Sequence, residues 1–293
     1  MEDKEKMNVN KKEKTGLVLE GGGLRGIFTA GVLDFFLEKN IEFDGCIGVS
    51  AGSCHACSYL SKQYKRAFNV SVDYLDDKRY CSMHSLITTG DLFGVDFVYG
   101  EIPDKLNPID NETFMKSRTR FQAVITNCRT GEAEYPDVKD FRTDTVYIRA
   151  SSSLPFLSKM VKINGELYLD GGVSDSIPIK KSIENGNIKN IIIMTRDKKY
   201  RKKQNKLGKI SAIRYKKYPK FVELMNTRFS RYNEILEYIY ELERQGKVFI
   251  IQPETPLNLG RIEKNKEKLT NVYNIGYKEA EKRYSAMMEY LAK

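Results

Sequence analysis

The chain has 293 residues, 41% of them hydrophobic, and a formal net charge of +10 at pH 7. This length allows one large α/β core with a modest C-terminal appendage, and no apolar run reaches the ~18 residues needed to cross a bilayer. The charged start lacks the apolar stretch of a secretory signal, and five scattered cysteines argue against a disulfide framework, so we expect a cytoplasmic protein.

Two strand–turn–helix units follow a polar N-terminal tail (1–15). Residues 17–19 are an apolar run that predicts a strand entering a glycine turn. Apolar residues then recur at three- and four-residue spacing over 24–35, as in a helix with one buried face. Residues 43–49 predict a second buried strand and residues 51–65 a second helix. This alternation predicts a parallel sheet with right-handed crossovers.

A hairpin is predicted near the middle of the chain. Asn164-Gly165 separates residues 160–163 from residues 166–169, and Asn-Gly is the strongest short hairpin signal. The second arm of this hairpin leads directly into Asp170. The other expected elements, in chain order, are helices and long loops (66–118), a strand (120–128) with a short return strand (133–135), a buried strand (190–195), a long helix (221–245), a last strand (247–252) and a helical end (261–293).

Most of the excess positive charge lies in one segment. Residues 196–220 contain twelve Lys or Arg and one acid, so this segment carries +11 and the rest of the chain about −1. Such a block either binds anionic lipid headgroups, at about 1 kcal/mol for each basic residue near the surface, or forms a solvated connection. The composition leaves both interpretations open, and without a recognisable binding module we expect no nucleic-acid partner. The membrane-binding candidates are Arg201, Lys202, Lys203 and Lys206.

Residues 48–52 (GVSAG) form the pattern G-x-S-x-G between a predicted strand and a predicted helix, which is the setting of a nucleophile elbow. Such a turn presents the Ser50 hydroxyl at the sheet edge, while Gly48 and Gly52 let neighbouring backbone approach closely. The N-terminus of the following helix favours a developing oxyanion. By chance the pattern arises in roughly one chain of this size in ten. The alternative interpretation is a serine that only caps the helix.

The histidine content decides which base such a serine can use. The α/β-hydrolase order is serine, acid, histidine, but His55 and His84 are the only histidines and no histidine occurs after position 84. His55 lies five residues after Ser50 on the same predicted helix, about 500° round and more than a turn away. We therefore predict a packed or surface histidine, and a carboxylate that accepts the serine proton directly.

Asp170-Gly171-Gly172 supplies a carboxylate at the end of a strand. The two glycines leave room for a substrate at the sheet edge. By itself such a tripeptide is more often only a turn. A buried aspartate within hydrogen-bond reach of a serine can nevertheless act as a general base.

Residues 21–26 (GGGLRG) form the first strand-to-helix turn. Consecutive unhindered amides that end on a helix N-terminus make an anion site, which suits the oxyanion of acyl transfer. The same residues also fit the dinucleotide-binding pattern G-x-G-x-x-G, with Asp44 eighteen residues after Gly26. That interpretation leaves Ser50 and Asp170 unexplained. The oxyanion-hole candidates are Gly21, Gly22, Gly23, Leu24 and Arg25, with Gly26 as support.

The three motifs in this order resemble the patatin-like phospholipase family, as do the surrounding segments ASSSLPF (150–156) and ELYLDGGVSDSIP (166–178). The resemblance covers about residues 16–196. It implies a three-layer α/β/α sandwich with a mostly parallel sheet. It also implies hydrolysis of lipid acyl esters, of phospholipase A or lysophospholipase type, without metal or cofactor. The implied catalytic dyad is Ser50 and Asp170, with the Gly21 to Gly23 amides as oxyanion hole and Gly48, Gly52, Gly171 and Gly172 as supporting glycines.

The remaining chain divides into a basic connecting segment (197–217) and a C-terminal part (218–293). The latter resembles a mainly helical extension of a bacterial subgroup of this family, and we expect it to pack on the catalytic domain. Two other functions stay open. One is a dinucleotide-binding oxidoreductase that uses residues 21–26, and the other is a lipid-binding module without catalysis. The sequence makes no prediction of oligomeric state.

Overall fold

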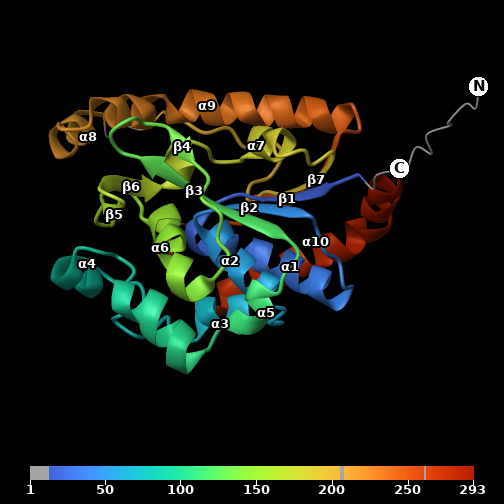
Figure 1. Ribbon diagram of the computed structural model, residues 1–293, viewed down its shortest axis with the longest axis horizontal. Helices are drawn as coiled ribbons and strands as arrows, with labels where there is room; N and C mark the ends of the chain where they lie inside the picture. Colours follow the sequence, from blue (N-terminus) through green and yellow to red (C-terminus); the bar gives the residue numbers. More distant parts are fainter. Residues whose placement is uncertain (1–12, 205–207, 261) are drawn as a thin grey trace, which may run out of the picture.

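The computed structural model describes residues 13–204, 208–260 and 262–293. Within them, eight strands form one mixed sheet in the order β5-β6-β3-β2-β1-β7-β8, with β4 paired to β3. The parallel part consists of β1 (Thr15–Leu19), β2 (Gly45–Val49), β3 (Arg120–Asn127), β7 (Lys189–Ile193) and β8 (Val248–Ile251). The antiparallel part consists of β4 (Ala133–Glu134), β5 (Val161–Ile163) and β6 (Glu166–Asp170). This confirms the mostly parallel sheet (Figure 1).

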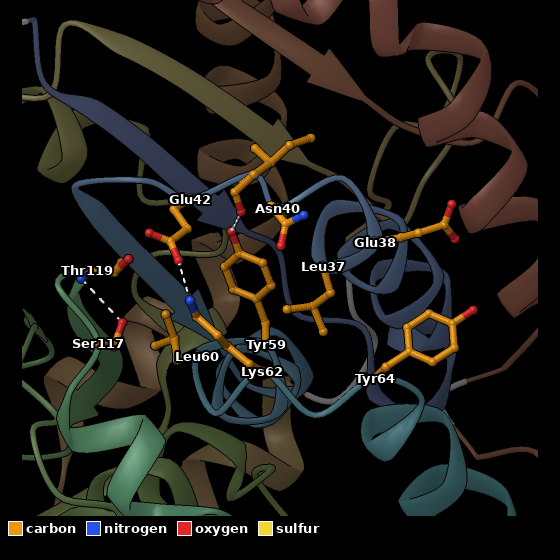
Figure 2. A pocket seen from close by; sticks show the side chains of 11 residues that line it. Leu37, Glu38, Asn40, Glu42, Tyr59, Leu60, Lys62, Tyr64, Ser117 and Thr119 are labelled. Carbon is orange, nitrogen blue, oxygen red and sulfur yellow. Dashed lines mark hydrogen bonds and ion pairs between the residues drawn. The ribbon is translucent and has the colours of Figure 1, made fainter.

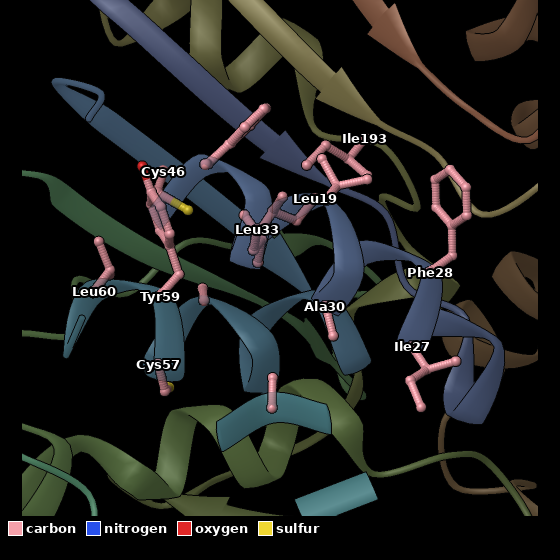
Figure 3. Close-up of a cluster of buried hydrophobic side chains, with 14 of the residues drawn as sticks. Leu19, Ile27, Phe28, Ala30, Leu33, Cys46, Cys57, Tyr59, Leu60 and Ile193 are labelled. Carbon is pink, nitrogen blue, oxygen red and sulfur yellow. The ribbon is translucent and has the colours of Figure 1, made fainter. Parts of the chain in front are cut away.

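Side chains of the central strands alternate between two apolar layers. Leu17 and Leu19 of β1 point to the layer formed with α1 (Ile27–Glu38), α2 (Ala51–Leu60) and α10 (Lys266–Ala292). Val18 points to the opposite layer, formed with α7 (Ile179–Glu184) and α9 (Pro219–Arg244). Helices therefore cover both faces, and the predicted three-layer sandwich is confirmed. Figure 3 shows the first layer, where side chains of α1 and α2 meet β1, β2 and β7.

α1 is buried on all sides, which the sequence did not predict. Every residue from Ile27 to Phe36 is buried because the sheet covers one side of the helix and α10 the other. The two helices cross through glycines. A Cβ on Gly31 would clash with the carbonyl oxygen of Tyr273, and a Cβ on Gly276 with that of Phe28. The contact thus depends on the absence of two side chains.

The stretch 66–118 consists of helices and loops, as predicted. It contains α3 (Arg66–Val72), α4 (Met83–Thr89), the π-helix η2 (Phe97–Leu106) and α5 (Asn111–Met115). α6 (Phe141–Ser152) was not predicted, although Asp140 caps it by accepting the amide of Arg142 at 2.9 Å. Two short 3-10 helices, η1 (Gly23–Gly26) and η3 (Gly171–Val173), follow β1 and β6.

The C-terminal part is integrated into the sandwich. β8 extends the sheet beside β7, while α9 and α10 cover opposite faces (Figure 1). The basic segment contains a helix, α8 (Gly208–Arg214). The boundaries at 197–217 remain a prediction. None of the described helices has the length and apolarity that crossing a membrane requires.

Candidate active site

Ser50 occupies the corner between β2 and α2. Its backbone angles, φ 55° and ψ −123°, are those of a type II′ corner, which favours glycine. The Ser50 amide donates to the Ser151 hydroxyl at 2.9 Å, and the hydroxyl oxygens of Ser53 and Ser151 are also 2.9 Å apart. Because Ser151 belongs to α6, that helix holds the strained corner in place.

The glycine turn packs directly on this corner. A Cβ on Gly21 would lie 2.9 Å from the Cβ of Ser50, and a Cβ on Gly52 would lie 2.7 Å from the carbonyl oxygen of Leu19. Larger residues at either position would therefore push the carboxyl ends of β1 and β2 apart. This close approach places the backbone of residues 21–23 beside Ser50.

Asp170 is buried at the end of β6. Its backbone amide donates to the carbonyl of Ser153 and its carbonyl accepts the hydroxyl of Thr126, both at 2.8 Å. Its carboxylate oxygen Oδ1 accepts the amide of Gly172, also at 2.8 Å. Two neighbouring segments thus fix the backbone of Asp170, and the Gly172 amide orients its carboxylate.

Ser50 and Asp170 line the same polar cavity, which has a volume of about 40 Å³. Gly21, Gly22 and Gly23 also line it, so the three sequence motifs meet at one place. The cavity lies at the carboxyl ends of the parallel strands, where ligands of open α/β sheets bind. Its charged lining residues are Arg25, Arg196, Lys202, Arg228, Glu20 and Asp170.

Ser50 also lines a second cavity, of about 110 Å³. Ser50, Gly23 and Leu154 line both cavities. The apolar side chains that line the second cavity are Leu24, Ala51, Ala67, Val70, Tyr80, Phe93, Val98, Tyr99 and Leu154. Leu24 and Arg25, both predicted near the oxyanion, therefore face different environments, since Leu24 lines the apolar cavity and Arg25 the polar one.

The histidines lie where the sequence predicts. His55 is buried on α2 beside Gly26, and burial lowers its pKa to about 4, so the ring is neutral. His84 is exposed on α4. Among the described residues, the Ser50 amide donates to the Ser151 hydroxyl, and the Ser50 carbonyl accepts the amides of Ser53 and Cys54 in α2.

Several residues of the site were not predicted from the sequence. Glu20 is buried and accepts hydrogen bonds from the hydroxyl of Tyr232 at 2.6 Å and from the amide of Thr195 at 2.7 Å. Burial and the nearby Glu20 carboxylate raise the pKa of Tyr232 far above its usual range. Arg196, Arg228 and Ser151 are further examples. No local motif marks them, because contacts between distant segments bring them to the site.

The four membrane-binding candidates lie in different surroundings. Arg201 forms an ion pair with Glu237 at 2.6 Å. The Lys202 ammonium lies 4.3 Å from the centroid of the Tyr232 ring and lines the polar cavity. Lys203 is exposed, and Lys206 lies outside the described residues.

The dinucleotide interpretation requires Asp44 near the glycine turn, but the two lie at opposite ends of the parallel strands. Asp44 precedes β2 and accepts the amide of Thr15 at 2.8 Å, at the amino ends of β1 and β2. A five-residue strand spans about 16 Å, so Asp44 lies at the opposite edge of the sheet from residues 21–26.

A cavity of about 540 Å³ also lies at that opposite edge. Figure 2 shows it between the ends of α1 and α2 and the segments that precede β2 and β3. Glu42 and Lys62 form an ion pair across it at 2.6 Å, and the Tyr59 hydroxyl donates to the carbonyl of Ile41. It contains none of the three motifs. Over the described ranges, no group of three or more His, Cys, Asp or Glu is placed to hold a metal ion.

Two family models match separate parts of the chain. One, described as patatin-like phospholipase, matches residues 17–182. The other, described as a domain of unknown function (DUF6363), matches residues 218–292. The polar cavity receives side chains from both regions, because Arg228 and Tyr232 of α9 line it together with Ser50 and Asp170.

Three relatives illustrate what the chain is similar to, and the names of two of them describe lipid hydrolysis. The uncharacterized protein YjjU of Escherichia coli is 27% identical over 84% of this chain and 70% of its own length. The probable lipid hydrolase 463L of invertebrate iridescent virus 6 is 23% identical over 90% of this chain and 87% of its own. Lysophospholipase NTE1 of Candida albicans is 29% identical over 61% of this chain but only 13% of its own length. Among solved structures, VipD of Legionella pneumophila matches with a TM-score of 0.46 and 14% identity, over 96% of this chain and 67% of its own.

Proposed function

The chain belongs to the patatin-like phospholipase family, and from this premise we propose that it hydrolyses acyl esters of phospholipids or lysophospholipids, with Ser50 as nucleophile and Asp170 as base. Relatives named lysophospholipase and probable lipid hydrolase support this class of reaction. The observation that carries the proposal is that Ser50, in a strained elbow, and Asp170 line one cavity together with the glycine turn.

The proposed reaction has two steps. The Ser50 oxygen attacks the ester carbonyl carbon while Asp170 accepts the hydroxyl proton. The amides of Gly22 and Gly23 stabilise the negative carbonyl oxygen, and Asp170 then donates the proton to the leaving alcohol. Water next attacks the acyl-enzyme, gives its proton to Asp170, and the Ser50 oxygen takes that proton as the acid leaves. The base returns to its starting state without a cofactor.

Because Ser50 lines both cavities, the two parts of an ester substrate can be assigned to different cavities. We infer that the acyl chain enters the apolar cavity on the side of Leu24 and Val70, because burial of methylene groups is favourable there. The alcohol part of the ester then lies in the polar cavity with Asp170. The apolar cavity is smaller than the ~300 Å³ of a typical small-molecule site, so a long acyl chain would extend beyond it.

Two alternative functions lead to different experimental results. The dinucleotide interpretation is disfavoured because Asp44 lies at the opposite edge of the sheet from residues 21–26. A lipid-binding module without catalysis would retain the cavities but would not react at Ser50. Tight NADH binding without labelling of Ser50 would support the first alternative, and lipid binding without labelling would support the second.

We also propose peripheral contact with anionic membranes through α8 and α4. α8 carries the exposed Ile210 and Ile213 beside exposed lysines of the basic segment, and α4 carries the exposed Met83 and Ile87. Both helices lie at the left end of the molecule in Figure 1. Exposed isoleucines next to cations match an interface between acyl chains and acidic headgroups. Because each of the five cysteines is a free thiol, we keep the cytoplasm as the proposed compartment.

The loop after α6 connects this face to the cavities. The amide of Phe156 donates to the hydroxyl of Tyr215, just after α8, at 2.8 Å, and the amide of Lys159 donates to Asp91, just after α4, at 2.9 Å. Leu154, in the same loop, lines both cavities. A lipid bound at this face would therefore lie near the loop whose Leu154 lines both cavities.

The test of the nucleophile is chemical labelling. A fluorophosphonate probe should form an adduct that mass spectrometry maps to Ser50. Ser50→Ala should abolish labelling and hydrolysis of a short-chain nitrophenyl ester, since alanine lacks the attacking oxygen. The melting temperature should change little, because alanine keeps the Cβ and the backbone bond to Ser151. Hydrolysis retained by Ser50→Ala would place the nucleophile elsewhere.

A further inference from the structure

One wall of the polar cavity comes from outside the part of the chain that matches the phospholipase family. Arg196, Tyr200 and Lys202 follow β7, and Arg228 and Tyr232 belong to α9. The family match ends at residue 182, and α9 lies in the region whose family has no known function. The C-terminal region therefore contributes side chains to the cavity that holds Ser50 and Asp170.

This wall is cationic and its charges are held in place. The Arg196 guanidinium lies 4.3 Å from the centroid of the Tyr200 ring, and the Lys202 ammonium lies 4.3 Å from that of Tyr232. The two rings pack edge to face with centroids 6.0 Å apart. The backbone of Lys202 also exchanges two hydrogen bonds with the Asn233 side chain, at 2.8 and 3.0 Å. Such packing reduces the entropy that a bound anion would otherwise cost.

Arg228 brings a further guanidinium close to the catalytic carboxylate. Its Nη2 and the Asp170 Oδ1 both lie 3.0 Å from the point where a Cβ on Gly172 would stand, so these two atoms are at most about 6 Å apart. A side chain at residue 172 would occupy the space between them. Because residue 172 is a glycine, no side chain at this position separates the guanidinium from the reacting groups.

Cationic side chains outnumber carboxylates in the lining of this cavity. Arg25, Arg196, Lys202 and Arg228 stand against Glu20 and Asp170. Glu20 already accepts hydrogen bonds from three neutral donors, the Tyr232 hydroxyl and the amide and hydroxyl of Thr195. A small cavity with excess positive charge favours an anion, and guanidinium groups favour phosphate because their donors match its oxygens.

We propose that Arg228, Arg196 and Lys202 form a binding site for the phosphate of a lipid with a net anionic headgroup. The inference rests on the proposed function, because it places the leaving alcohol of the ester in the polar cavity and the acyl chain in the apolar one. A zwitterionic headgroup would bring a second, positive group to the cationic wall, which like-charge repulsion disfavours. The C-terminal region thereby determines which headgroup the catalytic serine meets.

The test compares two lysophospholipids with the same acyl chain, lysophosphatidylglycerol and lysophosphatidylcholine, at concentrations where both are monomeric. The unmodified protein should have a kcat/KM about tenfold higher for the anionic lipid. Arg228→Gln should remove most of this preference, and Arg228→Lys should restore part of it. Arg244→Gln removes an exposed charge of the same helix that pairs only with Glu241 among the described ion pairs, and it should leave the preference intact.

A binding measurement separates failure of the inference from failure of the proposed function. Titration calorimetry of Ser50→Ala with each lysolipid reports headgroup preference without turnover. If Ser50 is labelled and both lipids are hydrolysed equally, with Arg228→Gln and Lys202→Gln lowering both rates alike, the headgroup site is wrong and the hydrolase stands. Preference for the anionic lipid in binding, without any labelling or hydrolysis, would support the site and overturn the hydrolase. Competition by inorganic phosphate as strong as that of the anionic lysolipid would show recognition of free phosphate and overturn the lipid assignment.

Discussion

Ser50 shows how backbone strain and close packing coincide at a reactive residue. Its left-handed corner costs about 1–3 kcal/mol in general terms, and the hydrogen bond from its amide to Ser151 helps to maintain it. The motif around Ser50 was predicted because its five residues, 48–52, are consecutive in the sequence. Ser151 was not, since it lies 101 residues away along the chain and only the folded arrangement of α6 brings it to the elbow.

The proposed base is tested by Asp170→Asn. Asparagine keeps the shape and can still accept the amide of Gly172, but it does not accept a proton from Ser50. The turnover number should therefore fall at least about 100-fold, the lower end of what general base catalysis contributes. Steady-state kinetics with a nitrophenyl ester measure this, and thermal melting checks that the variant is folded.

The matched control removes every histidine of the chain. The double variant His55→Ala, His84→Ala should retain most of the turnover number. Burial already lowers the pKa of His55 to about 4, so this imidazole is neutral from about pH 5 upward and cannot account for a rise of activity between about pH 5 and pH 7. A folded double variant as inactive as Ser50→Ala would make a histidine the base.

At the scale of elements, the most regular patterns were predicted and the mixed ones were not. The hairpin over β5 and β6 was predicted because Asn-Gly favours the positive φ that a two-residue turn requires. Asn164 and Gly165 both adopt positive φ in the structure. α6 was missed because FRTDTVYIRASS mixes β-branched and polar residues, which have low helix propensity. Its helical form depends on packing against β3 and β6.

The proposed membrane face is also a property of elements, and a single exposed side chain tests it. Ile213 on α8 and Ile87 on α4 are 76% and 79% exposed, so each can be changed without opening the core. Ile213→Asp and Ile87→Asp should each weaken binding to vesicles of phosphatidylglycerol by about tenfold, because a carboxylate replaces apolar contact and meets anionic lipid. Vesicle co-sedimentation measures this loss.

A matched isoleucine on another surface controls for charge and hydrophobicity. Ile188 is 59% exposed and precedes β7, at the amino edge of the sheet, so Ile188→Asp should leave vesicle binding unchanged. Equal losses in the three variants would indicate non-specific effects and remove the argument for an α8–α4 face.

At the scale of the whole molecule, the C-terminal region completes both the core and the site. Its α10 covers α1, and the hydroxyl of Tyr290 accepts the amide of Asn190 at 2.9 Å and donates to the carbonyl of Lys247 at 2.8 Å, joining the ends of β7 and β8. α9 lies on the other face and supplies Arg228. The sequence predicted that this region packs on the catalytic part. It did not predict the side chains delivered to the cavity, because helix periodicity identifies a buried face but not its partner.

Asp34 connects α1 to α10 and makes the free energy of unfolding depend on pH. It is a buried residue of α1 whose carboxylate accepts the hydroxyl of Tyr273 of α10 at 2.7 Å and the amide of Lys65 at 3.1 Å. Burial raises its pKa from 3.8 to about 6, against the lowering effect of these hydrogen bonds. The folded state therefore holds this proton more tightly than the unfolded state. The resulting stability is fully present below about pH 4 and is lost as the pH rises through about 6.

Asp34→Asn should remove this dependence. The difference between the two pKa values corresponds to about 3 kcal/mol, an upper bound on what wild-type stability loses between about pH 4 and about pH 7.5 through this group. Asparagine carries no charge and can still accept a hydrogen bond from Tyr273, so the free energy of unfolding of Asp34→Asn relative to wild type should increase as the pH rises. Urea unfolding at about pH 4.5, 6 and 7.5 measures this difference, with Glu289→Gln, an exposed carboxylate of α10, as control. A difference that stays constant across these pH values would show that Asp34 does not titrate differently in the folded and unfolded states.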